Sequence, residues 1–368
     1  MKHMINSRAV YVVLAVILAL MLCACAASFV PQTSVDANQE VPLTGSPDPD
    51  TAIDDNPKPD ETPVMNKYPR TVTDQAGRIV VIERQPESIV SGYYISSSAC
   101  IALGLTDNFV GIEARADSRP IYALAAPMLL ELPNVGTAKD FNLEACLALS
   151  PDIVILPIRL WDAADILTEI DVPVILVNPE SYGEIIEMIA LIGEATGTDE
   201  RAERLIEWFA QTCNSISEKN AHALSRPDVY ISGVSSWLTT APSDMYQSSL
   251  VDIAGGQNAA RNIDGSGWVE ISYEQLIAMN PEVIIIPSEA GYSVEDVLAD
   301  STISELEAVK NNAVYKMPFE YEAWDSPIPS SMLGAIWLSS VLHQETYPMI
   351  DLHQATIDFY SEFYGINT

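Results

Sequence analysis

Basic residues are scarce in this sequence of 368 residues, which has 18 lysines and arginines, 51 aspartates and glutamates, and a formal net charge of −33. Because a protein that binds nucleic acid needs a basic face for the phosphates, this composition excludes nucleic acid as a partner. Histidine is also rare, with four residues in the chain, which leaves little material for a histidine metal cluster. The sequence therefore predicts neither a nucleic-acid-binding protein nor a protein with its own metal site.

Cysteine occurs five times, without the paired spacing of a zinc site or a disulfide framework. Cys100, Cys146 and Cys213 lie in helical apolar patterns, so we expect buried thiols without a function, and one disulfide among the three stays open. The sequence also has no GxSxG elbow, no HExxH and no P-loop. We therefore expect no catalytic residue, although a carboxylate pair of the glycosidase kind keeps a surface-anchored hydrolase as an alternative.

A short apolar run follows the basic residues at the N-terminus. Lys2 and Arg8 precede Ala9–Leu22, a run of fourteen residues without charge. As a helix this run would extend roughly 21 Å, which is less than the ~30 Å hydrocarbon core of a membrane. It is therefore predicted to be a signal peptide and not a membrane span.

The end of this run, Leu22-Cys23-Ala24-Cys25, resembles the lipobox of bacterial lipoproteins. The resemblance implies a signal peptide over residues 1–24, cleavage before Cys25 and a lipid on the sulfur of Cys25; a plain signal peptide is the alternative. The chain is then expected outside the cytoplasm, anchored to the cell membrane on its periplasmic or cell-surface side. Residues 26–67 contain seven prolines, eight acidic residues and two lysines, so residues 25–67 are predicted to be a disordered tether.

Short β-rich runs alternate with helical patterns in the remaining residues, 68–368. Thr71–Ile82 is predicted to be a hairpin with its turn at Asp74–Gly77. The other predicted strands are Ser88–Val90, Asp152–Leu156, Val174–Val177, Asp228–Ser232, Val283–Ile286 and Ala313–Lys316. Strands separated by helices indicate parallel α/β layers.

An internal repeat at an offset of 130 residues divides this region. Glu144–Pro157 aligns without gaps to Glu274–Pro287, with five of fourteen positions identical and seven conservatively replaced. Each copy is predicted to be a short helix that stops at a Ser-Pro or Asn-Pro step and is followed by a buried strand. The repeat predicts two similar lobes, an N-terminal lobe over residues 68–197 and a C-terminal lobe over residues 223–368.

A long amphipathic helix is predicted between the lobes, over residues 198–222. Its apolar residues follow the spacing i, i+3, i+4, i+7 and are Ala202, Leu205, Ile206, Phe209, Ala210, Cys213 and Ile216. Thr198 is expected to cap this helix, and Asp199 and Glu200 complement the helix dipole in its first turn. As the only link, such a rod is expected to limit the lobes to small rocking motions.

The order of these features resembles the substrate-binding proteins of ABC importers for iron-siderophores, haem and cobalamin. The resemblance rests on the lipobox, the acidic tether, the repeat copies, the long helix and the segments Arg70–Arg78, Ala254–Ala260, Trp324–Pro327 and Leu333–Trp337. It implies an α/β fold of two Rossmann-like lobes joined by a single long α-helix, with the ligand cleft between the lobes. It also implies that the protein captures one chelate and delivers it to a membrane permease without performing chemistry.

In that family one glutamate on each lobe docks into arginine pockets of the permease, and the matching positions here are Glu144 and Glu274. Each lies near a predicted helix start, after Asn142 or Ser272, at the same place in the two repeat copies. The alternative is that each glutamate only complements a helix dipole.

Aromatic and arginine residues in predicted loops are the candidates for the ligand site, because ligands of open α/β sheets bind beyond the carboxyl ends of the strands. The candidates are Tyr93, Tyr94, Trp161, Trp237, Tyr246, Trp268 and Trp324, together with Arg115, Arg119 and Arg159. Aromatic walls suit a large, flat chelate, and an arginine can pair with an anionic group on it. Interdomain packing and surface ion pairs are the alternatives for single residues. Trp208 and Trp337 lie in helical patterns and are predicted to be core residues.

Together these features predict a lipid-anchored substrate-binding protein for an iron chelate, with a ferric siderophore preferred, that feeds an ABC permease and its ATPase. The protein is expected to act as a monomer and to need no cofactor, because any metal would arrive inside the bound chelate. Haem, a corrinoid or an oxyanion such as molybdate are the alternative cargoes. A lipoprotein that senses a ligand for a regulator is a third alternative with the same fold.

Overall fold

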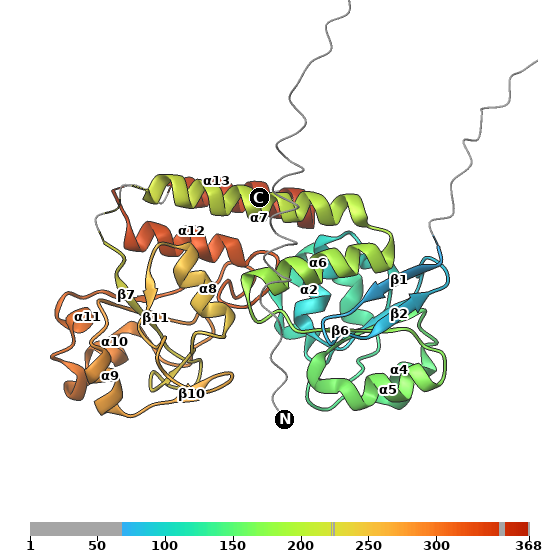
Figure 1. The fold of residues 1–368 in the computed structure, drawn as a ribbon, viewed down its shortest axis with the longest axis horizontal. Helices are drawn as coiled ribbons and strands as arrows, with labels where there is room; N and C mark the ends of the chain where they lie inside the picture. Colours follow the sequence, from blue (N-terminus) through green and yellow to red (C-terminus); the bar gives the residue numbers. More distant parts are fainter. Residues whose placement is uncertain (1–67, 222, 224, 346–349, 367–368) are drawn as a thin grey trace, which may run out of the picture. The chain divides into compact units, whose positions relative to one another are not determined.

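Two four-stranded parallel sheets organise the structure, a computed structural model that describes residues 68–221, 223, 225–345 and 350–366 (Figure 1). The N-terminal sheet has the order β4 (Phe109–Gly111), β3 (Ile89–Ser91), β5 (Ile153–Pro157) and β6 (Val174–Val177). The C-terminal sheet has the order β9 (Gln257–Asn258), β7 (Asp228–Ile231), β11 (Val283–Ile286) and β12 (Val314–Lys316). Each sheet thus has its second strand at one edge, followed by the first, third and fourth, so the two lobes share one topology.

The strands are short and apolar because helices cover both faces of a parallel sheet. β5, β6 and β11 are buried along their whole length. The predicted α/β class is confirmed, and every predicted strand overlaps an observed one. The sequence pattern misses β4 and β9, because strands of three and two residues are too short to show alternation.

Helices connect the strands within each lobe (Figure 1). Those before the linking helix are α2 (Tyr94–Ala102), α3 (Pro120–Ala125), α4 (Leu143–Ala148), α5 (Trp161–Glu169) and α6 (Tyr182–Thr196). Those after it are α8 (Tyr246–Ile253), α9 (Tyr273–Met279), α10 (Val294–Leu298), α11 (Glu307–Lys310), α12 (Ser331–Leu342) and α13 (Ile350–Tyr364). Short 3-10 turns are η1 (Thr106–Asn108), η2 (Ala116–Ser118), η3 (Pro127–Glu131), η4 (Ile158–Leu160) and η5 (Ser301–Ile303).

Each lobe also carries a small antiparallel pair of strands. The pair β1 (Arg70–Thr73) and β2 (Ile79–Ile82) is the predicted hairpin, with Val72 opposite Val80. In the C-terminal lobe β8 (Thr239–Thr240) pairs with β10 (Val269–Glu270), which the sequence pattern does not predict.

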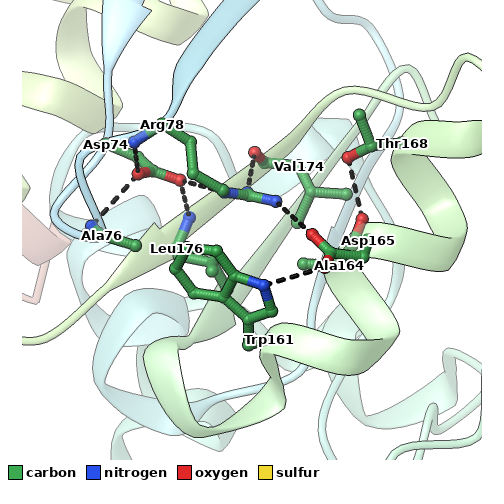
Figure 2. A network of polar contacts seen from close by, with 9 residues as sticks. All are labelled: Asp74, Ala76, Arg78, Trp161, Ala164, Asp165, Thr168, Val174 and Leu176. Carbon is green, nitrogen blue, oxygen red and sulfur yellow. Dashed lines mark hydrogen bonds and ion pairs between the residues drawn. The ribbon is translucent and has the colours of Figure 1, made fainter.

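A buried charge pair holds the first hairpin to the N-terminal sheet (Figure 2). Asp74, only 4 % exposed, accepts hydrogen bonds from the backbone N–H groups of Ala76, Arg78 and, in β6, Leu176. Arg78 Nε donates to the same carboxylate at 2.9 Å, and Arg78 Nη2 donates to the carbonyl oxygen of Val174 at 2.7 Å. The turn is therefore fixed to β6 by side chains that are shielded from water.

The linking helix α7 (Asp199–Asn220) runs from the N-terminal to the C-terminal lobe. It buries Ala202, Leu205, Phe209, Thr212 and Ile216. Thr198 occupies the N-cap position, but its side chain makes no capping hydrogen bond and lies 3.0 Å from the hydroxyl of Thr196 instead. The prediction that the Thr198 side chain caps the helix is therefore wrong. The predicted helix end at residue 222 lies outside the described residues.

The single long helix α7 joins the lobes, as predicted, and the C-terminal helix α13 adds packing contacts between them. The rings of Trp208 in α7 and Phe359 in α13 lie 4.5 Å apart, and Arg201 Nη2 donates to the carbonyl oxygen of Phe363 at 2.9 Å. α13 also contacts α2 of the N-terminal lobe. One apolar cluster, which includes Trp337, contains residues of both lobes, and the described residues belong to one compact unit.

The two repeat copies have the same local geometry. Ser150 and Asn280, which end the helical parts, both adopt left-handed backbone conformations, with φ of 50° and 41°. The aligned residues Asp152 and Glu282 each accept a hydrogen bond of 3.0 Å from a backbone N–H group at the start of β3 or β7. Matched side chains thus hold matched strands.

The structure describes three of the five cysteines in the sequence. In the described part of the chain Cys100, Cys146 and Cys213 are free thiols, the first two buried and the third half-buried. The predicted signal peptide, the tether and Cys25 lie outside the described residues. No helix in the described ranges combines the length and the apolarity needed to cross a membrane.

Candidate functional site

A cleft of about 630 Å³ lies between the two lobes and is lined by both. Tyr93 follows β3, Arg159 follows β5 and Glu180 follows β6, whereas Val234 follows β7 and Glu289 follows β11. The cleft therefore lies beyond the carboxyl ends of the parallel strands in both lobes, where open α/β sheets bind their ligands.

Two tyrosines form the aromatic part of the N-terminal wall. The rings of Tyr93 and Tyr94 meet edge to face, with their centroids 5.5 Å apart. The guanidinium carbon of Arg159 lies 5.0 Å from the centroid of Tyr93, and that of Arg119 lies 3.7 Å from the centroid of Tyr94. Burial raises the pKa of both phenols, so both stay neutral and can donate a hydrogen bond.

Carboxylates outnumber guanidinium groups along the cleft. Five acidic residues line it, namely Glu180, Glu184, Asp244, Glu289 and Asp325. Arg159 is the one basic residue among the lining residues that the structure describes. Burial raises the pKa of Glu180, and the charge of Arg159 opposes that shift. The described lining therefore carries more acidic than basic groups.

Asp325 and Gln247, which are 6 % and 5 % exposed, are the most buried polar residues of the lining. These two residues form the floor of the cleft. Ser288 Oγ donates to the carboxylate of Asp325 at 3.1 Å, and Gln247 Nε2 donates to the backbone carbonyl oxygen of Asp325 at 2.8 Å. Burial raises the pKa of the Asp325 carboxyl. Gln247 Oε1 is buried and has no hydrogen-bond partner among the described residues.

Two hydrogen bonds join the lobes beside the cleft. Tyr94 Oη donates to Ser326 Oγ at 3.2 Å. The hydroxyl of Ser98 in α2 donates to Glu322, and Ser330 Oγ donates to the other oxygen of that carboxylate at 2.7 Å. Glu322 is 6 % exposed, and burial raises its pKa.

Trp268 reaches the cleft from a glycine-rich loop between β9 and β10. Gly265 and Gly267 have φ of +156° and +70°, which glycine adopts far more readily than other residues. The side chain of Trp268 is 39 % exposed, so it lines the cleft instead of filling the core.

Four of the ten predicted ligand residues line the cleft, namely Tyr93, Tyr94, Arg159 and Trp268. Arg119 lies beside it, against Tyr94, in an adjoining cavity that also contains Glu322. These five residues are the part of the prediction that the structure brings together.

The structure places the other five predicted residues away from the cleft. Trp324, which is 1 % exposed, and Tyr246 are core residues, and Trp324 Nε1 donates to Tyr360 Oη at 3.0 Å. The ring of Trp237 packs on Tyr292 inside the C-terminal lobe, with centroids 5.3 Å apart. Arg115 is exposed at the start of η2.

Trp161 is also outside the cleft, at the N-terminus of α5 (Figure 2). Its Nε1 donates to Asp165 at 2.8 Å, and the guanidinium carbon of Arg78 lies 5.6 Å from its ring centroid. The contacts with Asp165 and with Arg78 of the hairpin therefore hold Trp161 on the surface of the N-terminal lobe.

The acidic lining and Gln247 are what the sequence analysis missed. With 51 acidic residues in the chain no single carboxylate stands out, and no local pattern marks a glutamine whose amide oxygen stays unpaired. A signal does exist for Glu180 and Glu289, because each closely follows a predicted strand.

A resident metal ion finds no ready site in the described ranges, where no group of three or more His, Cys, Asp or Glu side chains is placed to hold one. The acidic lining residues are thus spread over the cleft instead of converging on one point.

Glu144 and Glu274 lie at equivalent exposed positions in the first turns of α4 and α9. The helices are capped in the same way, because the side chains of Asn142 and Ser272 accept hydrogen bonds from the third backbone N–H, at 3.0 and 3.2 Å. Both glutamates are thus exposed at the start of a capped helix.

One family model and several known proteins are similar to this chain in sequence. The family model described as "Periplasmic binding protein" matches residues 89–321. An uncharacterized ABC transporter substrate-binding lipoprotein of Bacillus subtilis is 27 % identical over 67 % of this chain and 78 % of its own length. A vitamin B12-binding protein of Yersinia pestis is 25 % identical over 54 % of this chain and 69 % of its own length.

Solved structures share the fold. The Haemophilus influenzae molybdate-binding protein MolA, bound to molybdate, superposes with a TM-score of 0.72 over 81 % of this chain and 99 % of its own, at 22 % sequence identity. This protein and MolA thus share one fold.

Proposed function

Because this chain belongs to the periplasmic binding protein family, we propose that it captures an iron chelate, with a ferric siderophore preferred, and hands it to an ABC permease. The general role, that of an extracytoplasmic substrate-binding protein of an ABC transporter, is that of its family and relatives. Proteins of this kind carry a solute and catalyse no reaction, so the hydrolase alternative is set aside. The identity of the cargo depends on the cleft.

The aromatic cleft is the observation that supports an organic chelate. Its volume of about 630 Å³ falls in the usual range for small-molecule sites, roughly 300–1,000 Å³. Tyr93, Tyr94 and Trp268 give it apolar contact surface with polar tips. A bare oxyanion would need a small pocket of converging N–H groups and cations instead. A dianion such as molybdate would also face five carboxylates.

A corrinoid is the second candidate cargo, because one relative is a vitamin B12-binding protein. A corrinoid is also large and can stack on aromatic rings. Haem shares these properties and is the remaining organic alternative. All three cargoes would bring their metal with them, so the protein itself would need no cofactor.

Delivery is proposed to use Glu144 and Glu274 as the contacts with the permease. They are exposed, they carry the same charge, and they occupy equivalent positions on the two lobes. A monomer with two such points suits a permease that has two halves. The lipid on Cys25 is proposed to keep the protein at the membrane, as in the lipoprotein relative.

An absorbance titration of the full chain with ferric siderophores, haem and cobalamin, and a calorimetric titration with molybdate, test this function. We expect saturable binding of a ferric siderophore. Trp268→Ala should weaken it several-fold, because an aromatic contact contributes about 0.5–1.5 kcal/mol. Trp161→Ala is the matched control and should bind like the wild type. Binding of molybdate alone would contradict the chelate function.

A further inference from the structure

The charges that line the cleft do not match an anionic cargo. Glu180 and Glu184 lie on the N-terminal wall, and Asp244, Glu289 and Asp325 lie on the C-terminal wall. A negatively charged chelate would be repelled from both sides when the lobes hold it. Because binding sites and their ligands have complementary charges, the acidic lining is informative about the charge of the cargo.

The arginines near the cleft do not reverse this sign. Arg159 lies over the ring of Tyr93 and Arg119 over the ring of Tyr94, at 5.0 and 3.7 Å from the ring centroids. Arg119 belongs to the adjoining cavity, next to Glu322. Among the described lining residues, one is basic and five are acidic.

An unpaired amide oxygen gives independent support. Gln247 is 95 % buried, and its Oε1 has no hydrogen-bond partner among the described residues. The amide orientation is fixed, because Nε2 donates to the carbonyl oxygen of Asp325 at 2.8 Å and a flipped amide would put two acceptors together. A buried acceptor without a donor is unfavourable. The floor of the cleft thus holds an amide oxygen, Gln247 Oε1, that lacks a hydrogen-bond donor.

We infer that the cargo is a positively charged metal chelate whose N–H donor group, of the ammonium or guanidinium type, is held at the floor by Gln247 and Asp325. This inference rests on the proposed function, because it assigns the charge of the chelate that the same cleft binds. The rim carboxylates Glu184, Asp244 and Glu289 attract the cation, and the floor orients it. Tyr93 and Tyr94 contact the chelate body.

An inorganic cation is a poorer occupant of the cleft. A metal ion requires several ligands within about 2–2.6 Å of one point, whereas the described residues include no group of three or more metal-ligating side chains so placed. The aromatic side chains and the volume of about 630 Å³ also suit an organic molecule.

A charge series on one chelate tests the inference. Ferric desferrioxamine B is a trihydroxamate with one pendant ammonium group; N-acetylation makes that group neutral, and N-succinylation makes it negative. All three are titrated into the full chain while the tryptophan fluorescence is recorded, at low and at high NaCl concentration. We expect the ammonium form to bind about tenfold or more tightly than the acetylated form, because charge-assisted hydrogen bonds are the strong ones. The succinylated form should bind weakest, and salt should reduce the difference.

The outcomes separate this inference from the proposed function. Equal affinity for the three chelates, or tightest binding of the succinylated form, would overturn the charge inference and leave the chelate function in place. If none of the three binds while haem or cobalamin does, both the charge inference and the siderophore function are overturned.

Substitutions test which residues read the charge. The triple variant Glu184→Gln, Asp244→Asn, Glu289→Gln should lose most of the preference for the ammonium form, and Gln247→Met should lose the part that depends on the floor. Glu187→Gln is the matched control, because Glu187 is exposed on the same helix as Glu184 and does not line the cleft. Circular dichroism confirms that each variant is folded. An unchanged preference in the folded triple variant would contradict the assignment.

Discussion

Individual carboxylates have different roles in this acidic protein because their surroundings differ. Glu322 is buried and accepts hydrogen bonds from Ser98 of the N-terminal lobe and Ser330 of the C-terminal lobe. Burial raises its pKa, and Tyr364 and Arg119 also face it and lower that pKa. Glu144, in contrast, is exposed on a helix end. The first carboxylate acts within the fold, whereas the second is exposed to solvent.

Glu322 should make the stability of the protein depend on pH. Its pKa is raised above the ordinary value of 4.5, so the folded state holds the proton more tightly than the unfolded state. The stabilisation is therefore fully present below pH 4.5 and is lost as the pH rises through the folded-state pKa. Glu322→Gln cannot titrate and should lack this loss. Urea unfolding between pH 4 and pH 8 measures it, and parallel profiles for both proteins would contradict the prediction.

Charge reversal at the two exposed glutamates should separate uptake from binding. In the double variant Glu144→Arg, Glu274→Arg we expect uptake to be abolished, because like charges would meet at the arginines proposed for the permease. Affinity for the chelate should stay unchanged, since neither residue lines the cleft. Uptake by cells and binding to purified protein are measured in parallel. Glu187→Arg, on another exposed helix face, is the control. Wild-type uptake by the double variant would rule out this docking role.

At the scale of the elements, the repeat explains how two lobes arise from similar local rules. α4 with β5 and α9 with β11 follow the same sequence pattern, and Asp152 and Glu282 hold the first strand of each lobe in the same way. Arg84 strengthens this in the N-terminal lobe, since its Nη2 donates to Asp152. The lobes differ where the first one adds a hairpin and fixes it through Asp74.

Removal of the Asp74 carboxylate should destabilise the N-terminal lobe strongly. Asp74→Ala leaves Arg78 and the N–H of Leu176 without their buried partner, and breaking a buried pair costs about 3–5 kcal/mol of unfolding free energy. Chemical denaturation measures the loss. The matched control is Asp252→Ala, which breaks an ion pair with Arg226 whose side chains are both 60 % exposed, and it should cost about 0–1 kcal/mol. Equal losses for the two variants would contradict the role of the hairpin network.

For the whole molecule, two helices and a shared core restrict how the lobes move. α7 links them along the chain, and α13 contacts α7 through Phe359 and also packs on α2. One apolar cluster contains residues of both lobes. A large hinge opening would separate these contacts and expose buried apolar surface, which is unfavourable.

Cargo binding should therefore change the overall dimensions of the protein only slightly. We expect nearly superimposable small-angle scattering profiles for the folded chain with and without a saturating ferric siderophore. The variant Phe359→Ala, which removes a ring whose centroid lies 4.5 Å from that of Trp208, should widen the difference between the two profiles. A large compaction of the wild type on binding would show that the lobes close on a flexible hinge.

The sequence by itself determined the α/β class, the repeated helix–strand unit and the long helix between the lobes. These features have local causes. A buried strand is a continuous run of apolar residues, and an amphipathic helix repeats its apolar residues every 3.6 positions. Proline interrupts a helix through its own ring and missing N–H group. The strands Val174–Val177 and Val283–Ile286 follow from the pattern residue for residue. The duplication was visible because both copies obey the same local rules.

Only the tertiary structure decided which side chains meet in the cleft. The sequence pattern predicts that Trp161 and Trp268 both lie in loops near the ligand. Of these two, Trp268 lines the cleft, whereas Trp161 contacts Asp165 and Arg78 outside it. Trp324 reads like a ligand residue and is core. Gln247 gains its importance only when folding buries its oxygen without a donor. The residues that line the cleft come from loops of both lobes, which are far apart in the sequence. No local sequence pattern shows which of these loops lie together in the folded protein.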